Sequence, residues 1–190
     1  MNILVIAGYD VGGDKIPVHR EYVKKSFWRG YDEKMGLIFI VGGATNPDYP
    51  ELTEAEANFS ILKEEFLNNS ELFTPFRIKV LSIGNTSAET LQAVKEYLEK
   101  ERISVNKLIL CAEQSRLAGF LVDALHVGLL DLSKQIIAYG HPFPDSKKNF
   151  HFQRKKMPMK VLSHRSKMLC LARKIYQKIH QRKVACQRRV

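Results

Sequence analysis

Residues 3–7 read Ile-Leu-Val-Ile-Ala and are followed directly by Gly8. A short, uninterrupted apolar run of this kind is typical of a strand that is buried on both faces of a parallel sheet. Four later runs have the same character, at residues 37–41, 78–83, 108–112 and 135–139. The sequence therefore predicts five strands, the first of which begins within the first few residues.

The stretches between these strands have helical periodicity. The expected helices cover residues 17–34, a stretch that begins at Thr53, a stretch that begins at Thr86, and residues 115–126. The second and third open on Thr-x-x-Glu, which is the spacing of a capping box. Strands that alternate with helices predict right-handed βαβ units. We expect an α/β fold, a Rossmann-like three-layer sandwich with a mostly parallel five-stranded sheet.

Charge divides the chain into two parts. Residues 1–146 contain 15 Lys and Arg against 20 Asp and Glu, whereas residues 147–190 contain 15 Lys and Arg and no acidic residue. We therefore expect a Rossmann-like domain over 1–146 and a basic C-terminal segment over 147–190. Residues 160–181 have the periodicity of an amphipathic helix. Such a helix either packs on the domain or binds nucleic acid or an anionic membrane surface.

The chain is expected to be cytoplasmic. No apolar run approaches the roughly 18 residues that a membrane span needs, and the first residues do not resemble a signal peptide. The three cysteines, Cys111, Cys170 and Cys186, have no metal-ligand spacing and read as free thiols of a reducing compartment.

A ligand is expected at the carboxyl ends of the strands, where open parallel sheets bind small molecules. The loops that follow the expected strands there are rich in glycine and polar residues, although they contain neither a GxGxxG nor a P-loop motif. The residues expected to bind the ligand are Gly8, Asp10, Gly42, Gly43, Glu54, Asn85, Ser87, Glu89, Gln114 and Arg116.

The carboxylates of this edge narrow the ligand class. Asp10, Asp48, Glu54, Glu89 and Glu113 are expected near it, against a single cation, Arg116. An acidic rim suits ribose hydroxyls, an amino group, a sulfonium or a divalent metal better than it suits a polyphosphate. Purely structural roles remain open, because Glu89 completes a capping box and Glu54 lies in a first helical turn.

No catalytic residue is predicted. His19 and His141 are candidate acid–base groups, and Cys111 is a candidate reactive thiol at a strand end. Ordinary structural roles are the favoured interpretation for each of them, since the spacing establishes no nucleophile–base pair.

The order of the motifs resembles the YdcF-like family, which includes the SanA and ElyC relatives. The similar elements are a first strand ending near Gly8, the Gly42-Gly43 loop, Leu-Thr-Glu-Ala at 52–55, Asn-Thr-Ser-Ala-Glu-Thr at 85–90 and Gln-Ser-Arg at 114–116. They span roughly residues 2–140. The resemblance implies a Rossmann-like domain with a polar pocket, whose residues by position are Gly42, Gly43, Glu54, Ser87, Glu89 and Arg116.

The family's biochemical role is poorly defined. One member is associated with S-adenosylmethionine binding and others with envelope or peptidoglycan biogenesis. The present chain departs from the family pattern at Gln114, where histidine is usual, and at Thr90, where asparagine is common. No counterpart of the N-terminal anchor of the envelope members is expected, which argues against an envelope role.

Three functions follow as hypotheses. The favoured one is a domain that binds a small polar ligand of adenosyl or nucleotide type, with S-adenosylmethionine as a candidate. The second is an adaptor that uses its basic C-terminal segment on nucleic acid or an anionic membrane. The third is a metal-assisted hydrolase of a phosphorylated or nucleotide-type substrate, for which the acidic rim would hold a divalent metal.

Overall fold

A computed structural model of the chain describes residues 1–9, 11, 17–45, 49–66, 76–84 and 86–141, together with the backbone of 159–162. Its sheet has the strand order β3-β2-β1-β4-β5-β6. The strands are β1 (Asn2–Ala7), β2 (Leu37–Val41), β3 (Arg77–Leu81), β4 (Val105–Glu113), β5 (Ser133–His141) and β6 (Met159–Leu162). The first five are parallel to one another, as the apolar runs predict, and β6 pairs antiparallel with β5.

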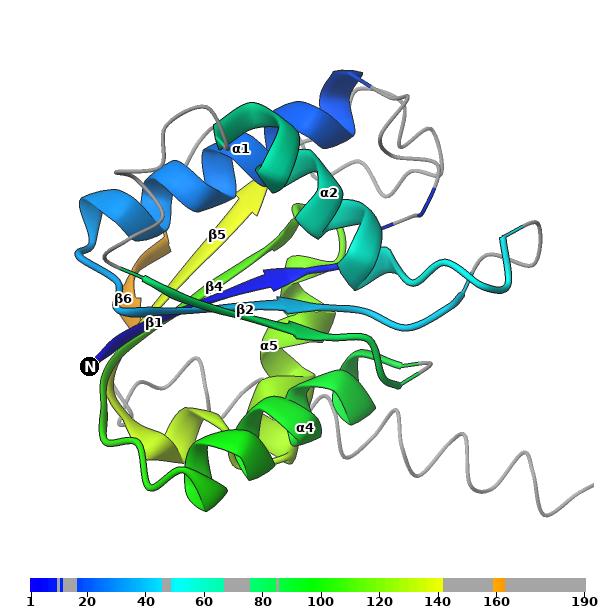
Figure 1. Ribbon diagram of the computed structural model, residues 1–190. Coiled ribbons are helices and arrows are strands. Elements are labelled where there is room, and N and C mark those ends of the chain that lie inside the picture. Colours follow the sequence, from blue (N-terminus) through cyan, green and yellow to red (C-terminus); the bar gives the residue numbers. More distant parts are fainter. Residues whose placement is uncertain are drawn as a thin grey trace, which may run out of the picture.

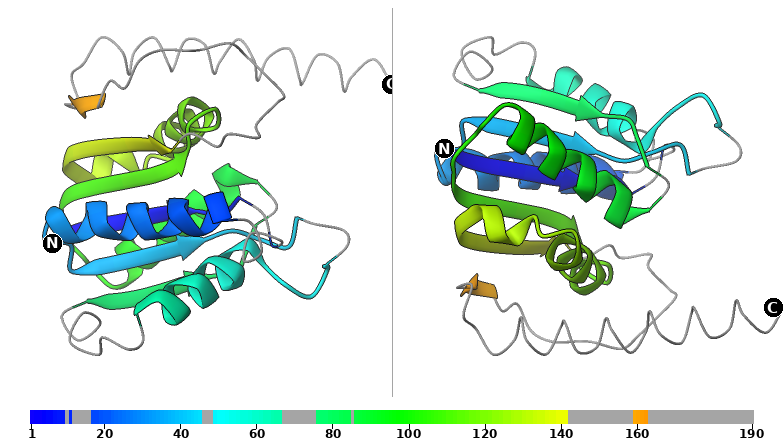
Figure 2. Two further views of the ribbon diagram at one scale, coloured as in Figure 1. Left: turned by 90° about the horizontal axis from the view of Figure 1, so that it is seen from above. Right: turned by 90° about the horizontal axis from the view of Figure 1, so that it is seen from below.

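Helices cover both faces of the sheet, which confirms the three-layer α/β fold. Helices α1 (Pro17–Asp32) and α2 (Glu54–Phe66) lie on one face, and α4 (Ser87–Lys100) and α5 (Leu117–His126) lie on the other (Figure 1). The view from above in Figure 2 shows the first pair in front of the sheet, and the view from below shows the second pair. Each layer buries its own apolar cluster against the strands.

Local sequence accounts for the bounds of the helices. The two predicted capping boxes are present: Thr53 Oγ1 accepts the Glu56 N–H at 3.2 Å, and Thr86 caps α4 in the same way. Gly128, with a φ of 73°, follows the last turn of α5. Its N–H donates to Leu125 and the next N–H donates to the carbonyl of Ala124, which is the hydrogen-bond pattern of a glycine-terminated helix.

The basic segment contributes a strand that the sequence reading did not expect. Residues 160–162 lie in β6, whereas the periodicity placed them at the start of a helix. A short apolar stretch is compatible with either structure, and pairing with the edge strand β5 decides between them. The rest of the expected helix, residues 163–181, lies outside the described residues.

In the parts of the chain that the structure describes, no helix has the length and apolar character needed to cross a membrane.

Candidate ligand-binding site

The carboxyl edge of the sheet has a topological switch point between β1 and β4. From β1 the chain proceeds to β2 and β3 on one side, and β4 and β5 are added on the other. Loops that leave the sheet in opposite directions at such a point create a crevice, which is where open α/β sheets bind ligands. The register brings the strand ends together there, since Ala7 pairs with Val41 and Ile6 pairs with Cys111.

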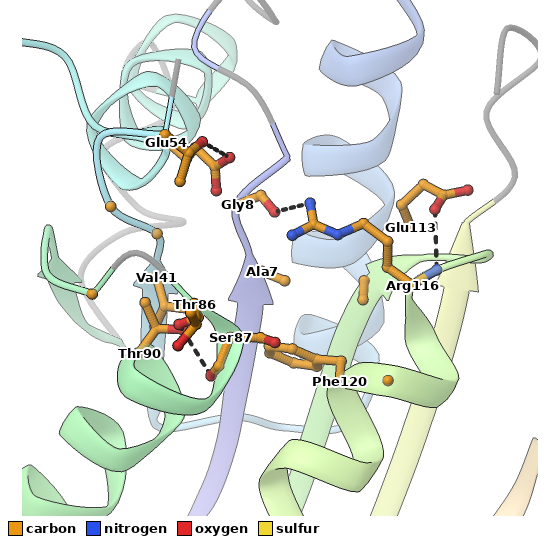
Figure 3. A pocket seen from close by; sticks show the side chains of 16 residues that line it. Ala7, Gly8, Val41, Glu54, Thr86, Ser87, Thr90, Glu113, Arg116 and Phe120 are labelled. Carbon is orange, nitrogen blue, oxygen red and sulfur yellow. Dashed lines mark hydrogen bonds between the residues drawn. The ribbon is translucent and has the colours of Figure 1, made fainter. Parts of the chain in front are cut away.

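A cavity of about 230 Å³ occupies this switch point (Figure 3). Its walls come from the ends of β1, β2 and β4, the loop before α4, and the first turns of α2, α4 and α5. The lining residues are Ala7, Gly8, Val41, Gly42, Gly43, Thr45, Glu54, Gly84, Thr86, Ser87, Thr90, Ala112, Glu113, Arg116, Gly119 and Phe120.

Two glycines allow the side chain of Glu54 to lie against the strand ends. A Cβ atom on Gly8 would lie 2.5 Å from Glu54 Cβ and 2.9 Å from the carbonyl oxygen of Val41. A Cβ atom on Gly42 would lie 2.7 Å from Glu54 Cβ, and its φ of 155° is strained for other residues. Both positions therefore require glycine because of the close approach of α2.

Glu54 is the first residue of α2 and is only 6% exposed. Its Oε1 atom accepts a hydrogen bond from Thr45 Oγ1 at 2.6 Å. No residue in the described part of the chain donates to Oε2, and none makes an ion pair with this carboxylate. Oε2 is therefore available to a ligand in the cavity.

Arg116 lies on the other side of Gly8, just before α5. Its Nη1 atom donates to the Gly8 carbonyl across 3.3 Å, and its guanidinium carbon is 5.9 Å from the centre of the Tyr9 ring. Figure 3 shows the guanidinium extending over the end of β1 toward Gly8, with Glu54 beyond it. This cation makes no salt bridge with a described side chain.

Glu113, at the end of β4, is 4% exposed and supports the loop that carries Arg116. Its Oε2 atom accepts the Ser115 hydroxyl and the Arg116 backbone N–H, the latter at 3.2 Å. In Figure 3 its carboxylate is turned away from Glu54. Its hydrogen bonds are thus directed to the protein backbone and to Ser115.

Hydroxyl groups line the wall formed by α4. Thr90 Oγ1 donates to the carbonyls of Thr86 and Ser87 at 3.1 and 3.0 Å. Ser87 Oγ donates to Asp123 of α5, which ties the two helices together beside the cavity. Thr86 Oγ1 accepts the N–H of the third residue of α4. The hydrogen bonds of these hydroxyl groups are made with the start of α4 and with α5, so we assign them a structural role in the wall of the cavity.

A buried polar network supports the end of β1 on the face of the sheet that α1 and α2 cover. The carbonyl of Ala7 accepts the Tyr22 hydroxyl at 2.8 Å and the Asn58 amide at 3.3 Å. His19 Nε2 in turn donates to Asn58 Oδ1 across 2.7 Å. Burial raises the pKa of the Tyr22 hydroxyl well above its ordinary value, so that this group stays a neutral donor.

The structure brings together most of the residues that the sequence suggested. Six of them line the cavity: Gly8, Gly42, Gly43, Glu54, Ser87 and Arg116. Glu89 and Gln114 are not among the lining residues. Glu89 accepts the Thr86 N–H at 3.2 Å as the capping box requires, and the Gln114 side chain is exposed. Asp10 and Asn85 lie outside the described residues, as does Asp48.

Other lining residues were not expected from the sequence. Nothing in the sequence around Thr45 indicates that it lines the cavity, because its place there depends on the side chain of Glu54 that it contacts. Gly119 and Phe120 lie inside a helix, and only the packing of α5 on the sheet turns them toward the cavity. Glu113 and Thr86 were noticed as a rim carboxylate and a helix cap, and both also line the cavity.

The candidate acid–base and thiol groups do not line the cavity. Burial, reinforced by the cations Lys25 and Arg29, lowers the pKa of His141 to about 4, and its ring packs against Tyr22 with centroids 5.3 Å apart. Burial raises the pKa of Cys111 to about 12. Cys111 is fully buried and therefore remains a protonated thiol, which favours a packing role over a reactive one.

Within the described ranges, no three His, Cys, Asp or Glu side chains lie close enough together to hold a metal ion. The metal-assisted hydrolase stays a prediction that these residues do not support. Comparisons of the chain with protein-family models, with curated proteins and with solved structures found no match.

Proposed function

We propose that this protein binds a small polar ligand of adenosyl or nucleotide type in the cavity at the switch point between β1 and β4. One observation carries the proposal: Glu54, which is nearly buried, and Arg116 face the same cavity at the edge where α/β sheets bind ligands, and neither forms an ion pair with a described residue. Glu54 would accept hydrogen bonds from donor groups of the ligand, and Arg116 would contact an acceptor or an anionic group.

The charge and size of the cavity limit the ligand. Its lining contains two carboxylates, Glu54 and Glu113, and one guanidinium, Arg116. A polyphosphate would therefore meet net repulsion, and a ligand with few negative charges is favoured. At about 230 Å³ the cavity is smaller than the 300–1,000 Å³ of typical ligand sites, so it holds one part of an adenosyl compound. The resemblance to the YdcF-like family makes S-adenosylmethionine the first candidate.

We propose binding and assign no catalytic residue. The hydroxyl of Ser87 donates to Asp123, and no histidine lines the cavity in the described part of the chain.

The direct test is thermal unfolding of the full chain in the presence of S-adenosylmethionine, its demethylated product, nucleosides and nucleoside monophosphates. A ligand at about 100 times its Kd adds about 2.7 kcal/mol of stability. For a chain of this size that raises Tm by about 5–10 °C. Arg116→Ala and Glu54→Gln should each reduce the stabilisation to about 0.4–1.4 kcal/mol, as expected for binding that is 10- to 100-fold weaker.

Two matched controls separate the site from general charge effects. Glu56→Gln removes a carboxylate two residues further along α2, and Glu89→Gln removes the capping carboxylate of α4. Neither residue lines the cavity. Both controls should leave the ligand-induced shift unchanged, and an equal loss in all four variants would contradict the site assignment.

The basic segment supports a second candidate function. Its 15 Lys and Arg residues without an acidic residue predict binding to a polyanion, either nucleic acid or an anionic membrane. Binding through phosphate contacts should weaken steeply as salt rises from 50 to 200 mM. Removal of 163–190 takes away nine of these 15 Lys and Arg residues and leaves β6 in place. It should weaken this binding, make it less dependent on salt, and leave the small-molecule shift intact.

A further inference from the structure

Glu54 and Arg116 present opposite charges to one cavity without pairing with each other. Both approach the same residue: Glu54 packs against Gly8, and Arg116 Nη1 donates to the Gly8 carbonyl at 3.3 Å. No ion pair in the described part of the chain involves either side chain. The two charges are thus held apart by one residue and left open to the same space.

The environment of Glu54 favours a positively charged group next to its carboxylate. Glu54 is only 6% exposed, and acidic residues buried to this extent in proteins are normally paired with a positive charge. Among the described residues, the one donor to this carboxylate is the neutral hydroxyl of Thr45, which contacts Oε1. Oε2 therefore faces the cavity with no positively charged partner among the described residues.

Arg116 has donor groups that can bind an anionic group. One of its N–H groups is occupied by the Gly8 carbonyl, and a guanidinium has five in a planar fork that suits a carboxylate. The Oε2 atom of the nearby Glu113 accepts from Ser115 and from the Arg116 backbone, and this carboxylate forms no ion pair with the Arg116 guanidinium. The remaining donors of Arg116 can therefore serve an anionic group in the cavity.

We propose that the cavity recognises a zwitterionic group, with an ammonium facing Glu54 and a carboxylate facing Arg116, as in an amino acid or the amino-acid part of a larger ligand. This inference rests on the proposed small-molecule function and names the ligand class of the same site. A phosphate dianion would face Glu54 with a like charge. A neutral polyol would leave both protein charges without a counter-charge.

The experiment uses matched ligands and isothermal titration calorimetry on the full chain. S-adenosylhomocysteine carries the zwitterion, whereas methylthioadenosine has the same adenosyl thioether without it. Methionine, its decarboxylated amine and its deaminated acid provide the same comparison without the adenosyl part. Each charged hydrogen bond that is lost should weaken binding by about 10- to 100-fold. Thus S-adenosylhomocysteine should bind more tightly than methylthioadenosine, and methionine more tightly than either of its analogues.

Two variants assign the charges to their partners. Glu54→Gln keeps the shape of the side chain and the oxygen that accepts from Thr45. It should weaken binding of the zwitterion and of the amine by about 10- to 100-fold and leave the deaminated acid unaffected. Arg116→Gln, at an exposed position that tolerates substitution, should show the opposite pattern. Glu56→Gln serves as the matched control and should change none of these affinities.

The outcomes separate the inference from the proposed function. Equal affinities for S-adenosylhomocysteine and methylthioadenosine would overturn the zwitterion inference and leave an adenosyl site standing. Binding of methionine as tight as that of S-adenosylhomocysteine would support the inference and remove the adenosyl part of the proposed function. Absence of binding by every probe would overturn both.

Discussion

Gly119 offers a substitution that should stabilise the fold and weaken the ligand site. It is the third residue of α5, it lines the cavity, and a Cβ atom added to it would meet no heavy atom within 4 Å. Glycine is a poor helix former, yet here an alanine has room. In Gly119→Ala the new methyl group would occupy space that the ligand needs.

The two effects have opposite signs and can be estimated separately. Replacing a helical glycine by alanine at a compatible site increases the unfolding free energy by about 0.4–1 kcal/mol. For a chain of this size that is an increase in Tm of about 1–4 °C. A methyl group forced into an occupied site costs about 1–3 kcal/mol, which corresponds to roughly 5- to 150-fold weaker binding.

Urea denaturation measures the gain in unfolding free energy. Calorimetric titration with the ligand found in the thermal screen measures the loss of affinity. The neighbouring Ala118→Gly is the control, because Ala118 is exposed and does not line the cavity. It should destabilise α5 by a similar amount and leave affinity unchanged. If Gly119→Ala gains stability and binds the ligand as the wild type does, the ligand is not at this wall. If the variant loses stability, the argument about free space is wrong.

Three further predictions concern the supports of the site. Tyr22→Phe leaves the buried carbonyls of Ala7 and Cys111 without the hydroxyl that reaches them at 2.8 and 3.0 Å, and it should cost about 1–3 kcal/mol in urea denaturation. Thr86→Ala removes the cap of α4 and should cost about 0.5–2 kcal/mol, measured by the same method, while a change below this range would argue against the capping role. His141 has a folded-state pKa of about 4, below its ordinary value of 6.5, so the unfolded chain binds more protons between these values. Its contribution to stability is therefore present above pH 6.5 and is lost as pH falls toward 4. Denaturation at a series of pH values should show that the unfolding free energy of His141→Gln depends less on pH over that window than the unfolding free energy of the wild type does.

Much of the fold could be predicted because its signals are local. The continuous apolar runs of β1 and β2 describe strands whose residues are almost all buried. The capping boxes at Thr53 and Thr86 and the glycine after α5 depend on residues a few positions apart, and all three are present in the structure. In contrast, β6 depends on pairing with β5, and nothing within the four residues of β6 distinguishes a strand from a helical stripe.

The sequence by itself determined that the sheet is parallel, that helices cover both of its faces, and that polar loops gather at its carboxyl edge, because these follow from periodicity and chain order. It could not tell apart the carboxylates of that edge. The tertiary structure decided that Glu54 faces the cavity with a free oxygen, that Glu89 completes a capping box, and that Glu113 supports the loop before α5. The physical reason is that the partners of a carboxylate come from loops distant in sequence, and their approach depends on glycines such as Gly8 that let α2 pack against the strand ends.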